Sequence, residues 1–202
     1  MYKGVFDIYS RYWHAYGGWK ALRQSPYLHL AALLLLATYA TWSQKDWWDQ
    51  VIAVIPNLLG FTLGGFAMFL GFGDEKFRAL LAEPDEDNPE QPSLYVSLCS
   101  TFVHFIVIQL SALICALLAK SWWFVLPWPP QVTQILPALN WIGGAIGYGF
   151  FLYAVTSVLA ATLHVFRIAT WYEQHQRVNA ERKAAEDLSA TQDNSLHHPP
   201  KA

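Results

Sequence analysis

The sequence contains few charged residues, and its longest apolar runs contain none of them in their interior. Only 14% of its 202 residues are Asp, Glu, Lys or Arg, compared with roughly 25% in soluble proteins. Hydrophobic residues make up 54% of the chain. A proton-coupled carrier or a charged ion filter usually needs an ionisable residue inside the membrane. The sequence therefore argues against both of these classes.

Several other features that would identify a function are missing. The net charge of -2 supplies no basic surface for nucleic acid. There is no Gly-x-Ser-x-Gly, no phosphate-binding loop and no His-Glu-x-x-His, so we do not expect an enzyme. No histidine or cysteine spacing typical of haem or metal occurs, so we expect no cofactor. Cys99 and Cys115 would lie ~24 Å apart on one helix, too far for a disulfide between them.

Four apolar runs predict four transmembrane helices in an all-α, polytopic membrane protein. A run of about 20 apolar residues is long enough to cross a ~30 Å hydrocarbon core. The second run, VIAVIPNLLGFTLGGFAMFLGFG, contains Pro56, which frees a backbone carbonyl near Ile52. The predicted spans are residues 27–45, 51–73, 94–119 and 138–166.

The two ends of the chain differ from this transmembrane domain of residues 26–166. Aromatic residues at three- to four-residue spacing, with basic neighbours, predict that residues 1–25 form an interfacial amphipathic helix that Gly17 weakens. These residues lack the apolar run of a cleavable signal peptide. Residues 167–188 should continue the fourth helix into the cytoplasm. Residues 189–202 show no pattern, and we expect them to be disordered.

Two connectors are rich in proline. Residues 83–93 contain three prolines and five acidic residues, which predicts a solvated loop rather than a cation site. Residues 74–83 before it should be helical, with Phe77, Leu80 and Leu81 on one side. Residues 120–137 contain three tryptophans and four prolines. We expect this connector to lie as an aromatic cap on the membrane surface.

The distribution of Lys and Arg predicts the orientation. Four lie in residues 1–25, two in residues 74–93 and five after residue 166, whereas Lys45 and Lys120 stand alone in the other two connectors. Cytoplasmic segments carry the excess of positive charge. Both termini should therefore be cytoplasmic, with the protein in the inner membrane of a cell.

The chain also contains signs of an internal repeat. Shifted by 75 residues, His29 aligns with His104, and a Trp-Trp pair follows at the same distance in both halves. An Asn-x2-Gly-x3-Gly pattern recurs with an offset of 83 residues. Duplication predicts two hairpins related by an axis along the membrane normal, as in parallel-repeat transporters. Chance similarity in a sequence of low variety is the alternative.

Small residues line one face of the second helix and one face of the fourth. This spacing lets another helix backbone approach closely. In lipid, where the hydrophobic effect does not drive helices together, such close packing stabilises their association. One such seam is enough for internal packing, so the second predicts contacts between protomers of a homo-oligomer. The seam residues are Asn57, Gly60, Gly64, Ala67, Gly71, Asn140, Gly143, Gly147 and Ala154.

Neutral polar residues in the spans are the other candidates for a site. Those of the third helix lie roughly on one face, where they either line a narrow aqueous path or hydrogen-bond between helices. His104 is a candidate pH sensor, because its protonation in a tight seam would push helices apart. The candidates are His104, Ser97, Thr101, Ser111, His29 and His164.

These observations favour a homo-oligomeric membrane scaffold, or a membrane subunit that docks a cytoplasmic protein through residues 167–188. The first alternative is a channel or pore-forming protein, and the second is a redox or metal-binding membrane protein. In size and predicted topology the chain resembles membrane subunits of bacterial anti-phage systems such as Kiwa. No motif carries this resemblance, so it implies no site residue.

Overall fold

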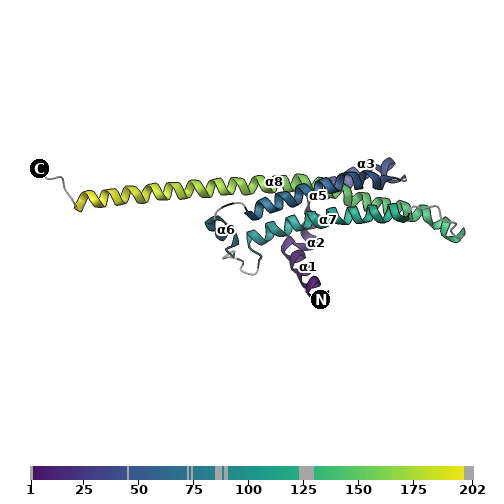
Figure 1. Ribbon diagram of the computed structural model, residues 1–202, viewed down its shortest axis with the longest axis horizontal. Coiled ribbons are helices and arrows are strands. Elements are labelled where there is room, and N and C mark those ends of the chain that lie inside the picture. The colour runs from purple at the N-terminus through teal and green to yellow at the C-terminus, as the bar shows by residue number, and fades with distance from the viewer. Residues whose placement is uncertain are drawn as a thin grey trace.

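The protein is an elongated helical bundle from which one helix continues far beyond the others, as the computed structural model in Figure 1 shows. The structure describes residues 2–44, 46–71, 73, 75–84, 88, 91–122 and 130–197, without the side chains of 130–132 and 190–197. All regular secondary structure among these residues is helical, which confirms the all-α class. Three helices are long and apolar enough to cross a membrane, as expected of a membrane protein: Trp47–Gly71, Leu94–Trp122 and the Thr133–Ser189 part of the last helix.

The amino-terminal fifth forms four helices: α1 (Tyr2–Tyr16), α2 (Gly18–Gln24), α3 (Pro26–Ala37) and α4 (Tyr39–Trp42). Gly17 separates α1 from α2 with a φ of 98°, a conformation that glycine adopts readily because it has no Cβ. Pro26 begins α3, where its missing N–H costs no helical hydrogen bond. As a result, α1 lies across the bundle while α3 runs along it (Figure 1).

The first apolar run is interrupted at Thr38. The Thr38 hydroxyl donates to the Leu34 carbonyl at 2.7 Å, and the Trp42 indole N–H donates to the Leu35 carbonyl at 2.7 Å. These side chains satisfy carbonyls near the break. With 12 residues, α3 alone is ~18 Å long, so a first membrane span requires α3 and α4 together.

The bundle is built by α5 (Trp47–Gly71), α7 (Leu94–Trp122) and α8 (Pro130–His197). The chain passes up and down along them, so α7 runs antiparallel to α5 and to α8 (Figure 1). Helix α8 is the central element, since it packs against α3, α5 and α7. At one end, the short helix α6 (Glu75–Ala82) buries Phe77 and Leu81, as its sequence predicts, whereas Leu80 is exposed.

The core has two parts. The first, which we call the tryptophan end, is covered by α3 and α4 and contains the buried Trp42, Trp47 and Trp48. The second, which we call the α6 end, lacks that cover and packs Phe77 of α6 with Phe102 of α7 and Ala161 of α8. At the tryptophan end α3 and α4 complete the bundle of α5, α7 and α8, whereas at the other end α6 takes that place.

Three expectations require correction. Trp47 and Trp48, which lie between the first two predicted spans, are 2% and 3% exposed and begin α5 within the core. Residues 130–137, expected in a surface cap, are the first turns of α8, because Pro130 occupies a first-turn position where proline is tolerated. Residues 189–197, expected to be disordered, continue α8, which is ~100 Å long in total. The rest of the cap, residues 123–129, and the last five residues lie outside the described part of the chain.

Candidate functional site

The most elaborate polar arrangement in the bundle surrounds His104 of α7, whose side chain is buried. The Tyr12 hydroxyl lies 2.8 Å from Nδ1 of His104, and the Tyr153 hydroxyl lies 3.0 Å from Nε2. A neutral imidazole donates from one nitrogen and accepts at the other, whereas a hydroxyl can do either. Both nitrogens are therefore satisfied in either tautomer.

Aromatic stacking adds to these hydrogen bonds. The Tyr16 ring lies parallel to the His104 ring, with the centroids 3.8 Å apart, and the Trp13 ring lies 6.4 Å away. The Tyr16 hydroxyl also lies 3.4 Å from the Tyr153 hydroxyl. We call Tyr12, Tyr16, His104 and Tyr153 the histidine cluster. It attaches α1 to both α7 and α8.

The histidine cluster is electrically neutral. Burial raises the pKa of Tyr12 and of Tyr16 above the ordinary value, and neighbouring tyrosines raise each pKa further. Both hydroxyls therefore stay protonated at physiological pH and can donate hydrogen bonds. Because the cluster lies where α1 meets the bundle, it acts as a clamp on α1.

The remaining polar candidates do not join this cluster. Thr101 and Ser111 donate to carbonyls one turn back on α7, at 2.9 and 2.8 Å, and Ser97 is half-buried. His29 is exposed, and His164 binds a carbonyl of its own helix at 2.9 Å. No three His, Cys, Asp or Glu side chains converge on one point within the described part of the chain. The pH-sensing role of His104 stays a prediction.

The small-residue seam of α8 is only partly filled, and tryptophan fills it at Gly147. A Cβ added to Gly147 would overlap the Trp47 ring, and one added to Gly144 would meet the Trp42 carbonyl. Ala154 is fully buried, whereas Gly143 has no atom within 4 Å of an added Cβ and Asn140 is half-buried. Gly147 thus receives a side chain of the same chain and Gly144 a backbone carbonyl of α4, whereas Gly143 stays open.

The seam of α5 is open. Cβ atoms added to Gly60, Gly64 and Gly71 would meet nothing within 4 Å, and Ala67 is exposed. The Asn57 amide donates to a carbonyl of its own helix at 3.3 Å rather than to a neighbour. Within the described part of a single chain, this face of α5 has no packing partner.

One buried polar pair was not predicted from the sequence. Gln109 of α7 is fully buried, and its amide nitrogen donates to the Thr62 hydroxyl of α5 at 2.8 Å. The Thr62 hydroxyl in turn donates to a carbonyl of α5 at 2.9 Å, while Oε1 of Gln109 has no partner among the described atoms. A glutamine in the middle of an apolar run was the available signal. Tyr153 gave no comparable signal.

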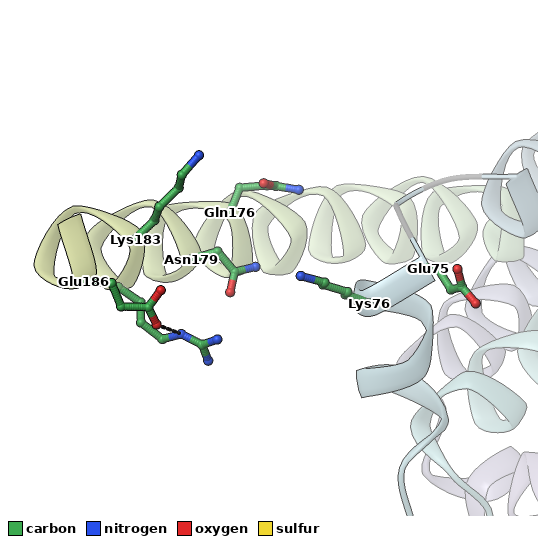
Figure 2. Close-up of a pocket in the computed structure, with 7 residues that line it drawn as sticks. Glu75, Lys76, Gln176, Asn179, Lys183 and Glu186 are labelled. Carbon is green, nitrogen blue, oxygen red and sulfur yellow. Dashed lines mark hydrogen bonds and ion pairs between the residues drawn. The ribbon is translucent and has the colours of Figure 1, made fainter. Parts of the chain in front are cut away.

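A polar shelf lies between α6 and the exposed part of α8. We call residues 176–197, which follow the contact of His175 with Phe77 of α6, the α8 arm. An open cavity of about 610 Å³ separates α6 from the α8 arm. Lys76 and Asn179 point into this space, whereas Lys183 points away from it (Figure 2).

No protein-family model, no curated protein and no solved structure matches this chain. Its function must therefore be inferred from its own residues and geometry.

Proposed function

We propose that this chain is a four-span membrane scaffold that forms homo-oligomers through α5 and docks a cytoplasmic protein through the α8 arm. The observation that carries the proposal is the continuity of α8. The same helix packs against α3, α5 and α7 and then continues as a polar helix whose residues 180–189 are exposed. A partner bound to the rod is thereby connected rigidly to the membrane bundle.

The composition of the α8 arm supports a docking role. Residues 180–189 are all exposed. Arg177 pairs with Glu181 at 3.3 Å, and Arg182 pairs with Glu186 at 3.2 Å. Such pairs, four residues apart, stabilise an exposed helix by roughly 0.2–0.5 kcal/mol each. They help the arm to remain helical while its charged side chains stay available to a partner.

The direction of α1 supports a membrane placement. Helix α1 lies across the bundle (Figure 1), and Tyr2, Val5 and Phe6 expose apolar surface at its free end. If α1 lies in the membrane interface, α7 crosses the bilayer from His104 toward Trp122, a length of ~27 Å. That length is close to the ~30 Å hydrocarbon core. The excess of Lys and Arg then places both termini in the cytoplasm of an inner-membrane protein.

The open face of α5 supports self-association. Gly60 and Gly64 would let a second helix approach closely, and in lipid such close packing is a main source of helix affinity. The relation of the two halves by duplication stays a prediction. His29 is exposed although its counterpart His104 is buried, and α3 packs on α8 rather than forming an isolated hairpin with α5.

The particle mass in nanodiscs tests the assembly. We expect the wild-type protein to have a multiple of the 22.9 kDa chain mass, and Gly64→Leu to reduce it, because leucine blocks the open face. Thr162→Leu, at another exposed position near the α6 end, is the control and should keep the wild-type mass. A monomeric wild-type particle would contradict the oligomeric scaffold.

Ion flux separates the scaffold from a channel. Thr101 and Ser111 of α7 donate to helix carbonyls, Gln109 donates to Thr62, and His104 bonds within the histidine cluster. We therefore expect proteoliposomes that contain the protein to be as tight to ions as empty liposomes. A flux that Gly64→Leu abolishes would favour the channel instead.

A photocrosslinking amino acid at Val178, an exposed position on the α8 arm, tests docking. In cells that naturally produce the protein, we expect one defined protein adduct. Reversing the charges of Arg177, Arg182 and Lys183 should remove the adduct. The same crosslinker at exposed Met68 of α5 should instead form an adduct between two copies of this chain. An absence of protein adducts at Val178 would contradict the docking role.

A further inference from the structure

An open cavity of about 210 Å³ lies where the turn between α2 and α3 meets the groove between α7 and α8. We infer that this cavity binds the headgroup of an uncharged glycerolipid with a free hydroxyl, such as a diacylglycerol. The site rests on the membrane placement proposed above but not on oligomerisation or partner docking. Its polar wall is formed by Tyr16, Ser25, Thr101, Tyr153, Ser157 and His164.

The absence of charge in the wall defines the first property of the ligand. Among the described residues that line the cavity, none is Asp, Glu, Lys or Arg. Moving an ionised group such as a phosphate from water into this wall would leave its charge without a counter-ion, which is costly. The rest of the wall is apolar and includes Phe105, Ala160 and Pro26. An uncharged ligand with an apolar part therefore fits better than a phospholipid headgroup.

The hydrogen-bonding atoms define the second property. Nδ1 of His164 lies 2.9 Å from the Ala160 carbonyl. Because a carbonyl can only accept, Nδ1 carries the hydrogen, and in the neutral form of the ring Nε2 is an acceptor. A ligand hydroxyl can donate to that nitrogen.

The tyrosines of the wall supply hydrogen-bond donors. The Tyr16 and Tyr153 hydroxyls are 3.4 Å apart, which is long for a bond between two hydroxyls. The hydroxyl hydrogen of Tyr16 can therefore turn toward a ligand carbonyl, and only a weak hydrogen bond to Tyr153 is lost. Diacylglycerol has both a hydroxyl donor and ester carbonyl acceptors, whereas a quinone offers acceptors only.

The volume defines the third property. About 210 Å³ is less than the roughly 300–1,000 Å³ of sites that enclose a drug-sized molecule. The cavity therefore holds a glycerol headgroup, and the acyl chains must lie outside it. An open cavity beside α1 and α2 allows this, since those helices are proposed to lie in the membrane interface.

Native mass spectrometry of the full-length protein in detergent tests the site. The probe is 1,2-dioctanoylglycerol, and the comparison ligands are dioctanoyl phosphatidic acid, which has the same chains with a charge, and decylubiquinone, which has no donor. We expect a saturable one-to-one adduct with dioctanoylglycerol and much weaker adducts with the other two. No adduct, or a stronger adduct with either comparison ligand, would overturn the inference.

Variants of His164 locate the adduct. We expect His164→Phe to weaken dioctanoylglycerol binding about tenfold, which corresponds to ~1.4 kcal/mol. His164→Gln should stay within about threefold of wild type, because its amide oxygen can still accept. His29→Phe, at an exposed histidine outside the cavity, is the matched control and should bind like wild type. Equal binding by wild type and His164→Phe would refute the site.

Two features keep the result interpretable. If His164→Phe does not elute as a folded particle, Ala21→Leu replaces it. A larger side chain at Ala21 would occupy part of the cavity from α2 and should also weaken the adduct. The same spectra record the mass of the ligand-free particle. The spectra therefore show whether the protein forms an oligomer independently of whether it binds the lipid.

Discussion

The tryptophan end and the α6 end use glycine in opposite ways. At the tryptophan end, Gly144 and Gly147 of α8 leave space that Trp42 and Trp47 occupy. Toward the α6 end, Gly64 and Gly71 of α5 leave space that no described atom fills. Small residues at helical spacing therefore permit close approach without specifying what approaches. Four predictions sharpen this comparison, in order of decreasing expected effect.

Gly147→Leu should have the largest effect, because its side chain must displace the buried Trp47 ring. We expect the free energy of unfolding to fall by at least about 3 kcal/mol, the upper range for overpacking a core. Thermal unfolding in detergent, followed by circular dichroism, measures the change. Gly143→Leu is the matched control, since its Cβ meets nothing, and it should unfold like wild type. Equal losses in both variants would remove the distinction between filled and open glycines.

His104→Phe tests the histidine cluster, which attaches α1 to the bundle. Phenylalanine keeps the stacked ring but leaves the Tyr12 and Tyr153 hydroxyls without their nitrogen partners. We expect a loss of about 2 kcal/mol, since two hydroxyls lose a partner and each costs about 1 kcal/mol, the low end of the range for buried groups, because Tyr12 is only partly buried and Tyr153 keeps the Tyr16 hydroxyl nearby. Hydrogen exchange should become faster in α1, which this cluster attaches. The protection of α1 would stay unchanged if the clamp were unimportant, and His29→Phe is the control for an exposed histidine.

The double change Gln109→Leu with Thr62→Val tests a polar pair that is only partly satisfied. Oε1 of Gln109 has no described partner, so the pair differs from the fully bonded His104. Replacing both members of a pair with apolar groups is often nearly neutral or stabilising. We expect the midpoint of thermal unfolding to stay the same or rise, by the equivalent of up to about 1 kcal/mol. A loss comparable to that of His104→Phe would show that Oε1 has a partner in the membrane.

Lys120→Ala should have the smallest effect. Its amine lies 2.8 Å from the Asp49 carboxylate, but both side chains are more than half exposed, at 55% and 56%. Exposed pairs contribute roughly 0–1 kcal/mol and weaken with salt. We expect a small loss at low ionic strength that disappears in high salt. A loss as large as that of Gly147→Leu would show that this pair closes the tryptophan end.

Local features of the chain were predictable, because they depend on composition and spacing. The all-α class, the apolar helices α5, α7 and α8, and the burial of Phe77 and Leu81 all follow from the periodicity of apolar residues. The interruption of the first run at Thr38 did not, because it depends on the Trp42 indole reaching back to a carbonyl seven residues earlier. That contact cannot be read from helical spacing.

The candidate site was predicted only in part. His104 was singled out as a polar residue in an apolar helix, but its partners Tyr12, Tyr16 and Tyr153 come from distant parts of the chain. Tyrosines suit both a membrane interface and a buried hydrogen bond, so their type did not identify their role. Only the packing of α1 and α8 against α7 brings them together.

Composition alone established that most of this chain forms helices, several of them apolar enough to enter a membrane, because length and hydrophobicity are properties of a segment by itself. The tertiary structure decided which of those helices face protein and which remain uncovered. Trp47 looks in sequence like an interfacial residue, yet it fills the space beside Gly147, while the equally suitable Gly64 is bare. A spacing pattern describes one surface only, whereas packing requires a second surface whose shape the pattern does not contain.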